Sequence, residues 1–331
     1  MIEKLLALLG RCDSFILTTH DPADADGIGA QMVVACILKD RGKRFRVINS
    51  SPLPDHFRFM DRLGVVEQWD SEGYGSLPEH SALIVVDTAE ESQMGQMREL
   101  IGRAREVFAI DHHEPKPGGA MLEGICDPTA ASTCELAVEL ALAAGSPIDP
   151  DSAFAAYVGI VYDTGFFAYP KVSRRTFAAA QELVKLGADP NDAYRRLCEN
   201  SPARSLYLQQ KAVASLTLHW GNRVAVQKLR REDFAETGAF SEDTDGFVNF
   251  PLRIRDVCIS FMIKETPEGK VSCSLRSKGA LNVAKIAGEF GGGGHFNASG
   301  FRSGTSVDDT VAKTLARLKE ALRASEQTEA Q

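Results

Sequence analysis

Short apolar runs alternate with amphipathic stretches along the first 130 residues of the chain. Apolar runs of four to six residues indicate strands, and an intervening segment with helical spacing indicates a crossover helix. This alternation predicts an α/β domain with a largely parallel sheet flanked by helices. The expected strands are 14–19, 45–50, 82–88 and 106–113, with an edge strand at 121–128, and the expected helix is 29–42.

Helical spacing dominates from residue 132 to about residue 217. Pro202 lies where a helix would restart, because proline is favoured in a first helical turn. The first ten residues are also expected to form an amphipathic helix. The predicted helices of the central region are 132–144, 150–162, 173–187 and 191–218, the last with a break at the sequence NSPA.

Strand-like runs return after residue 220 and predict a smaller α/β domain with a mixed sheet. We expect a first domain over 1–195, a helical connector over 196–220, a second domain over 221–325 and a polar tail over 326–331. The second domain is expected to contain strands 223–229, 257–265 and 270–278, a helix at 283–290, four glycines at 291–294, and a last helix at 307–323.

Composition limits the class of protein. The 331 residues are 44% hydrophobic and 25% charged, as in an ordinary globular protein, and the net charge is −8. Binding along a long nucleic acid duplex requires a basic surface, so the charge argues against it but leaves room for a small phosphorylated substrate. No apolar run reaches the roughly 18 residues of a membrane span. Seven scattered cysteines without a CxxC pair predict a reducing, cytoplasmic location, and a homodimer stays open.

Acids and histidines follow the apolar runs of four separate elements. Ligands of an open parallel sheet bind beyond the carboxyl ends of its strands, so these side chains are expected to gather at one edge. A single such residue would be explained by a strand-end hydrogen bond or a helix N-cap. Acids and histidines at the ends of four separate elements favour a shared site. The candidates are His20, Asp24, Asp26, Asp87, Asp111, His112, His113 and Asp163.

The types of these side chains predict the class of metal. Carboxylates mixed with imidazoles and without a thiolate suit manganese, iron or magnesium better than structural zinc. Several carboxylates can hold two divalent ions about 3.5–4 Å apart, the arrangement used for in-line attack on phosphorus. The stretch DPADADG resembles a calcium loop, but Pro22 and Val33 would occupy its first and last ligand positions, which excludes an EF-hand.

A four-glycine run precedes His295. It matches neither of the common glycine-rich phosphate loops, and it could serve as a flexible hinge. Bare backbone can also approach an anion closely and offer it N–H groups. Together with Arg276, Ser277 and Lys278, His295 would then form a clamp for phosphate and sugar.

These motifs resemble the DHH phosphoesterase superfamily. THDPADADG, VVDT, IDHHEP and VYDTG occur in its order and spacing, and SLRSKG with VAKIAGEFGGGGHFNASG is similar to the DHH-associated C-terminal domain. The likeness covers residues 10 to 325 and is greatest to the bacterial nanoRNases. It implies an enzyme that hydrolyses very short oligoribonucleotides and dephosphorylates 3′-phosphoadenosine 5′-phosphate (pAp).

The resemblance also implies a role for each site residue. Two ions are implied, usually manganese, with magnesium, iron or cobalt as other candidates. His20 and Asp24 would bind one ion, Asp26, His112 and Asp163 the other, and Asp87 both. His113 would face the substrate phosphate and Asp111 would support the site. The nucleotide would be held by Arg276, Ser277, Gly293, Gly294 and His295.

Three residues depart from the family pattern. Ala30 stands in place of a usual serine, Tyr162 in place of a usual threonine, and Ala168 in place of a polar or basic side chain. None is an implied metal ligand, so they bear on substrate preference rather than on the chemistry.

Three other functions remain alternatives. A cyclic- or linear-dinucleotide phosphodiesterase would use the same two domains. A pyrophosphatase would share the N-terminal motifs, but RSK followed by GGGGH suits a nucleotide better than a small dianion. A nucleotide-binding module without activity would be expected to have lost ligands, whereas every ligand position here is filled.

Overall fold

The computed structural model describes residues 2–70, 80–115, 121–266, 268–279 and 281–329. Contacts within the chain divide it into two compact units, Met1–Glu199 and Asn200–Gln331. Each unit has its own six-stranded sheet and its own hydrophobic core, so each is described by itself.

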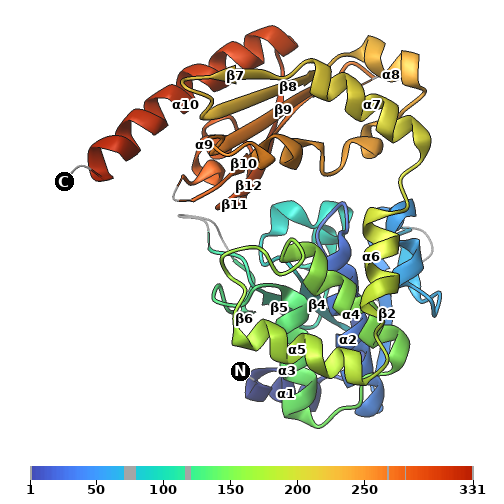
Figure 1. The fold of residues 1–331 in the computed structure, drawn as a ribbon. Helices are drawn as coiled ribbons and strands as arrows, with labels where there is room; N and C mark the ends of the chain where they lie inside the picture. Colours follow the sequence, from blue (N-terminus) through green and yellow to red (C-terminus); the bar gives the residue numbers. More distant parts are fainter. Residues whose placement is uncertain (1, 71–79, 116–120, 267, 280, 330–331) are drawn as a thin grey trace. The chain divides into compact units, whose positions relative to one another are not determined.

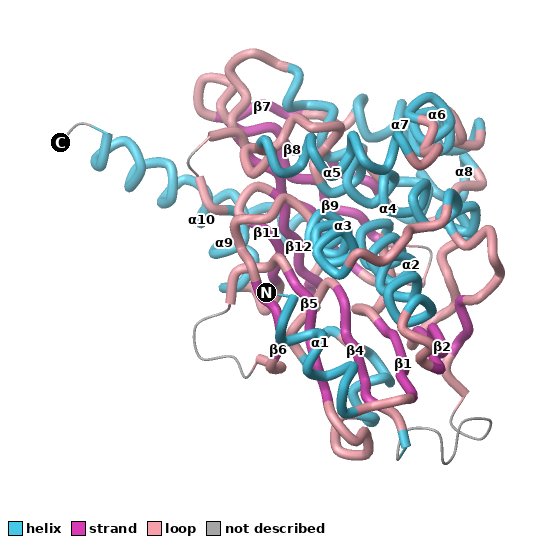
Figure 2. The backbone as a smooth tube through the Cα atoms, turned by 90° about the horizontal axis from the view of Figure 1, so that it is seen from below, coloured by secondary structure: helices cyan, strands magenta, loops and turns pink. Residues whose placement is uncertain are grey.

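The N-terminal sheet is entirely parallel. Its strand order is β3-β2-β1-β4-β5-β6, and Figure 2 shows β6, β5, β4, β1 and β2 side by side in that order. The edge strand predicted over 121–128 is confirmed as β6, next to β5. The strands are β1 (Ser14–Thr18), β2 (Arg44–Asn49), β3 (Val66–Gln68), β4 (Ala82–Val86), β5 (Val107–Asp111) and β6 (Gly124–Cys126).

Alternating side chains of the strands enter two different cores, because successive residues of a strand point to opposite faces. Phe15 and Leu17 of β1 pack into the larger core beneath the helices, and Ile16 packs into the smaller one on the other face. Figure 2 shows α1, α2 and α3 over the first face. The helices are α1 (Ile2–Arg11), α2 (Ala25–Asp40), α3 (Thr133–Ala144), α4 (Pro150–Asp163), α5 (Arg174–Lys185) and α6 (Pro190–Cys198), with 3₁₀ turns η1 (Asp55–Met60), η3 (Glu91–Gln93) and η4 (Gly95–Leu100).

Side chains at the helix starts fix where the helices begin. The Asp24 carboxylate accepts hydrogen bonds from the amides of Asp26 and Gly27 and so caps α2. Ser132 caps α3 by accepting from the Glu135 amide. Asp149 caps α4, whose first residue is Pro150.

The C-terminal sheet is mixed, as expected. Among the strands that the structure describes here, only β8 and β9 pair in parallel, and the other neighbours are antiparallel in the order β11-β12-β10-β9-β8-β7. Figure 1 shows β7, β8, β9, β10, β12 and β11 within this unit. The strands are β7 (Thr217–His219), β8 (Val224–Leu229), β9 (Ile259–Glu265), β10 (Val271–Ser277), β11 (Gly293–His295) and β12 (Ala298–Ser303).

Helices cover both faces of this sheet. Val283 of α9 and Val311 of α10 belong to one core, and Leu208 of α7 and Phe234 of α8 belong to the core on the other face. Among the helices that the structure describes, each is too short or too polar to span a bilayer. The helices are α7 (Ala203–Ala214), α8 (Arg231–Thr237), α9 (Val283–Glu289) and α10 (Val307–Glu329), with η5 (Ser241–Thr244) and η6 (Phe247–Arg253).

Candidate metal centre

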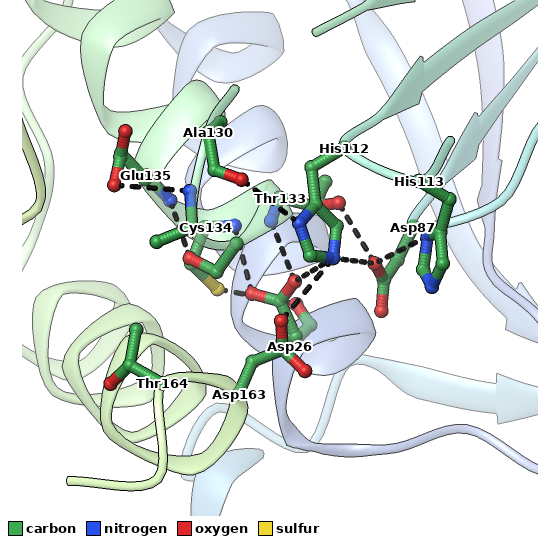
Figure 3. A network of polar contacts seen from close by, with 12 residues as sticks. Asp26, Asp87, His112, His113, Ala130, Thr133, Cys134, Glu135, Asp163 and Thr164 are labelled. Atoms are coloured by element: carbon green, nitrogen blue, oxygen red, sulfur yellow. Dashed lines mark hydrogen bonds and ion pairs between the residues drawn. The ribbon is translucent and has the colours of Figure 1, made fainter. Parts of the chain in front are cut away.

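The acids and histidines predicted from the sequence come together at one edge of the N-terminal sheet. Figure 3 labels Asp26, Asp87, His112, His113 and Asp163 of this cluster. β1, β4 and β5 are parallel neighbours, so the segments that follow them leave the sheet at the same edge. α2 and α4 add Asp26 from a helix start and Asp163 from a helix end. Five elements, spread over the first 163 residues, therefore supply one cluster of side chains.

Asp87 occupies the centre of this cluster in an unusual backbone conformation. It follows the last residue of β4 with a φ of 63°, a left-handed value that is uncommon outside glycine. Its amide donates to the carbonyl of Ile110 on β5, and its side chain is almost fully buried. Backbone strain of this kind persists where the surrounding structure enforces it, which is common at functional sites.

Donor atoms of the cluster form three groups of three, in each of which the atoms lie within 4.8 Å of one another. Asp87 belongs to two of the groups, and His112 also belongs to two. Two neighbouring ions could therefore share Asp87 between them. The groups are His20 with Asp24 and Asp87, Asp26 with His112 and Asp163, and Asp87 with His112 and His113.

Separations between the donor atoms suit a divalent ion. His112 Nε2 lies 3.3 Å from Asp163 Oδ2 and 3.9 Å from Asp26 Oδ2. His20 Nε2 lies 3.5 Å from Asp24 Oδ1 and 3.4 Å from Asp87 Oδ2. Ligand atoms about 2.1 Å from one ion lie about 3.0–3.5 Å apart at octahedral or tetrahedral angles. The donors are oxygen and imidazole nitrogen, which suits manganese, iron or magnesium.

Electrostatics also favour a cation in this cluster. Burial, together with the negative charges of Asp26 and Asp24, raises the pKa of Asp87 well above its usual value. The same causes raise the pKa of Asp163. The carboxylates are therefore crowded in their charged forms, and a divalent cation would relieve that repulsion.

His113 has a different environment from the neighbouring His112. His113 Nδ1 lies 2.7 Å from Asp111 Oδ1, whereas His112 Nδ1 lies 3.3 Å from the carbonyl oxygen of Ala130. Burial lowers the pKa of His113, but the hydrogen bond to Asp111 and the charge of Asp87 outweigh burial and leave it raised. Asp111 therefore orients His113 and favours its protonated form.

The start of α3 supports the cluster, and sequence reasoning missed this contribution. The amides of Thr133 and Cys134 donate to the two oxygens of Asp26, at 2.6 and 2.9 Å. The Thr133 hydroxyl donates to Asp87 Oδ1 at 2.8 Å. The preceding loop also supplies the Ala130 carbonyl to His112. Ser132, which caps α3, is a residue type that marks helix starts, but a local pattern of this kind does not show what the helix start faces.

Close packing of α2 against α4 brings Asp26 and Asp163 to the same site. Gly29 and Gly159 lie at the contact, where an added Cβ would meet backbone atoms of the opposite helix. At Gly159 it would lie 2.8 Å from the Ala25 carbonyl oxygen and 2.5 Å from the sulfur of Cys134. Both glycines therefore permit an approach that a larger residue would prevent.

Strand pairing brings part of the predicted nucleotide clamp together in the C-terminal domain. Arg276 of β10 and His295 of β11 both pair with Ala298 of β12, so they share one row across the sheet. Gly293 and Gly294 pair with β12 as well, and an added Cβ on Gly294 would lie 2.5 Å from the Ala298 carbonyl oxygen. The glycine run thus contributes to a strand, which argues against the hinge. The side chain of His295 lies outside what the structure describes.

Ser277 differs from Arg276 in its surroundings. Its hydroxyl donates to the carbonyl of Leu281 and accepts from Asn297, and its side chain is buried. Lys278 donates to the carbonyl of Ile254. Ser277 and Lys278 are therefore engaged within their own domain.

The three departures from the family pattern have different surroundings. Ala30 is buried in the core of the N-terminal domain, and Ala168 is exposed. The ring of Tyr162 packs edge-on against Phe57, with centroids 5.3 Å apart.

Comparison with known proteins gives relatives over nearly the whole chain. A bifunctional oligoribonuclease and PAP phosphatase of Thermus thermophilus is 28% identical, over 92% of this chain and 89% of its own length. A cyclic-di-AMP phosphodiesterase of Listeria monocytogenes is 30% identical over 97% of this chain, which spans 49% of that relative. A solved exopolyphosphatase-related protein of Bacteroides fragilis is 25% identical, with a TM-score of 0.87, over 100% of this chain and 97% of the other.

Two family models account for the two units. The model of the DHH family N-terminal domain matches residues 14–160, and the model of the DHHA1 domain matches residues 221–326. The first match contains every residue of the cluster except Asp163, and the second contains the glycine run. With both domains in this order, the chain belongs to the DHH phosphoesterase family.

Proposed function

We propose that the chain is a manganese-dependent hydrolase that degrades very short oligoribonucleotides to mononucleotides and removes a phosphate from pAp. The observation that carries this proposal is the sharing of Asp87 between groups of donor atoms, which suits two ions. The activities for which the Thermus thermophilus relative is named support the choice of substrates, because the similarity extends over 89% of that protein.

The groups of donor atoms support an assignment of ligands. His20 and Asp24 would hold one ion, Asp26, His112 and Asp163 the other, and Asp87 both. When bound, such ions would polarise a phosphoryl oxygen and make hydroxide available as a nucleophile near neutral pH. Thr133 and Cys134 hold Asp26 and Asp87 in place for this purpose, so the ligands are ordered before the ions bind.

His113 would contact the substrate phosphate. With Nδ1 held by Asp111, a protonated ring directs its Nε2–H away from Asp111 and can donate it to a phosphoryl oxygen. This role depends on the protonated form, which the Asp111 carboxylate favours. Asp111 would act through His113 and remain out of contact with the substrate.

The C-terminal domain would hold the nucleotide. The guanidinium of Arg276 would bind a phosphate through two hydrogen bonds. His295 and the backbone of Gly293 and Gly294 lie near Arg276 in the same sheet. Ser277 remains in this proposal as a residue that positions its neighbours, because its hydroxyl is already bonded within the domain. The expected partners are short single-stranded RNA and small nucleotides, and the scattered cysteines still predict a cytoplasmic location.

A second candidate is a phosphodiesterase for cyclic or linear dinucleotides. The identity of 30% to the Listeria monocytogenes enzyme favours it, although this chain spans only half of that protein. A substrate panel with Mn²⁺ separates the candidates: pAp, oligoribonucleotides of two to five residues, cyclic dinucleotides and pyrophosphate. We expect turnover of the first two. Hydrolysis of cyclic dinucleotides alone would establish the second candidate, and hydrolysis of pyrophosphate alone would refute the nucleotide clamp.

A panel of metals tests the choice of ion. The protein would be stripped with a chelator and assayed with Mn²⁺, Mg²⁺, Co²⁺ and Fe²⁺ in turn. We expect the highest turnover with Mn²⁺. Full activity without any added ion would refute the two-ion site.

A further inference from the structure

A polar hollow of about 390 Å³ lies in the N-terminal domain, outside the donor cluster. We name it the edge hollow. Its deeper residues are Asp21, Ser50 and Ser51, and the exposed side chains of Gln68 and Gln96 also line it. The volume falls within the range of about 300–1,000 Å³ that is typical of ligand sites.

The edge hollow continues the edge of the sheet that carries the metal centre. Asp21 follows β1, Ser50 follows β2, and Gln68 ends β3, all of them parallel strands. Asp21 is also the residue after His20, one of the proposed ligands. The hollow therefore opens at the carboxyl edge of the sheet, on the side of β1 that carries β2 and β3. Ligands of open parallel sheets bind at this edge.

Hydrogen bonds hold the deeper residues of the edge hollow in place. Ser50 Oγ donates to Asp21 Oδ2 at 3.3 Å and accepts from the Gln96 amide at 2.9 Å. The Asp21 amide donates to the carbonyl of Gln93 at 2.7 Å. Segments after β1, β2 and β4 are thus joined, so the hollow is a formed part of the domain.

The chemistry of the lining selects the kind of ligand. Asp21 and Glu99 contribute two carboxylates against the single guanidinium of Arg98, which disfavours a phosphate. Among the residues that the structure describes, the lining contains no aromatic side chain on which a base could stack. Hydroxyl, amide and carboxylate groups suit a neutral ligand with several hydroxyls, as in a ribose.

We propose that the edge hollow binds the ribose of the second nucleoside of a short RNA, next to the scissile phosphate. This inference rests on the proposed function. The ligand's 2′-hydroxyl both donates and accepts, so the hollow would distinguish RNA from DNA without preference for the base. A substrate with one nucleoside, such as pAp, would leave the hollow unused.

The test compares substrates that differ in this nucleoside alone. KM would be measured with Mn²⁺ for a diribonucleotide, for the same dinucleotide lacking the 2′-hydroxyl of that nucleoside, and for pAp. The variant is Gln68→Ala with Gln96→Ala, both exposed, and the control is Gln181→Ala on the exposed face of α5. We expect KM for the diribonucleotide to rise about tenfold in the double variant, through loss of two hydrogen bonds.

Two further comparisons decide the proposal. In the double variant the preference for the ribonucleotide over its deoxy analogue should fall toward one, and KM for pAp should stay within about twofold. An equal rise for pAp and the diribonucleotide would overturn the proposal, as would unchanged KM values for all three substrates. Failure of the unaltered protein to hydrolyse either pAp or the diribonucleotide would instead refute the proposed function, and this inference with it.

Discussion

Thr133 and Asp87 are 46 positions apart in sequence, yet the Thr133 hydroxyl donates a 2.8 Å hydrogen bond to Asp87 Oδ1. The same threonine donates its amide to Asp26. One residue at the start of α3 thus contacts a carboxylate from β4 and another from α2. Because both carboxylates are proposed ligands, Thr133 is expected to set their orientation before metal binds.

Thr133→Val should weaken Mn²⁺ binding about 10- to 100-fold, because it removes the hydroxyl but keeps the shape and the backbone amide. Thr133→Ser retains the hydroxyl and should stay within about threefold of the unaltered protein. Calorimetric titration of the metal-free proteins with Mn²⁺ measures both. Equal affinities for the valine and serine variants would show that the hydroxyl has no positioning role.

Loss of a central ligand should abolish turnover. Asp87→Asn keeps a side chain that tolerates the left-handed backbone at this position, where φ is 63°. Asp87→Ala and His112→Ala remove the donor entirely. We expect all three to lose activity on pAp by at least about a thousandfold while circular dichroism stays unchanged, since ions are expected to carry most of the catalysis.

Two other outcomes for these variants would have different meanings. A wild-type rate in His112→Ala would refute the assignment of that histidine to an ion. Lost activity with a lost dichroism signal would indicate a folding defect, and for Asp87→Ala the backbone strain would explain it.

The sequence predicted the cluster because its residues follow apolar runs, a local signal. Asp87 and Asp111 each lie at the end of a strand, and strand ends can be located from hydrophobic patterns. Thr133 could not be assigned in this way. Its role depends on where α3 begins relative to β4 and α2, which is a tertiary relationship absent from any local pattern.

The parts of the fold that the sequence missed share a physical cause. β7, β3 and β11 are three residues long and α8 is seven, so each gives only a weak periodic signal. β6 and α9 are equally short but were predicted, because apolar residues mark them in the sequence. The glycines of β11 carry no strand propensity, and the strand exists because β12 approaches its bare backbone closely. The helix predicted at 29–42 begins earlier, at Ala25, because Asp24 caps it. Asp24 also belongs to the metal motif, so the sequence did not identify it as a helix cap. The last helix, expected to end near 323, continues to Glu329.

Removal of metal should make stability depend on pH in a defined direction. In the metal-free protein, burial and neighbouring carboxylates raise the pKa of Asp87 above its unfolded value of about 3.9. A raised folded pKa contributes stability that is present below the unfolded pKa and lost as pH rises through the folded one. Metal-free Asp87→Asn should therefore be more stable than the metal-free unaltered protein at about pH 8, and this difference should shrink toward pH 4.

Thermal melts with and without Mn²⁺ check this expectation. Saturating Mn²⁺ should raise the Tm of the unaltered protein, because an ion that binds the folded state stabilises it. It should leave the Tm of Asp87→Asn nearly unchanged. If Asp87→Asn were less stable than the unaltered metal-free protein at about pH 8, the proposed repulsion among carboxylates would be wrong.

Gly159→Ala tests whether the contact between α2 and α4 sets the spacing of the ligands. The added methyl would lie 2.5 Å from the sulfur of Cys134 and 2.8 Å from the Ala25 carbonyl oxygen, so α4 must shift. We expect a loss of about 1–3 kcal/mol in the free energy of unfolding from overpacking. Because Asp163 lies at the end of α4 and Asp26 at the start of α2, Mn²⁺ affinity should also fall.

The matched control is Gly10→Ala in α1, where an added methyl meets nothing within 4 Å and should slightly stabilise the helix. Urea unfolding and Mn²⁺ titration of both variants measure these effects. Destabilisation of Gly159→Ala with unchanged affinity would show that the ligands keep their spacing without this helix contact.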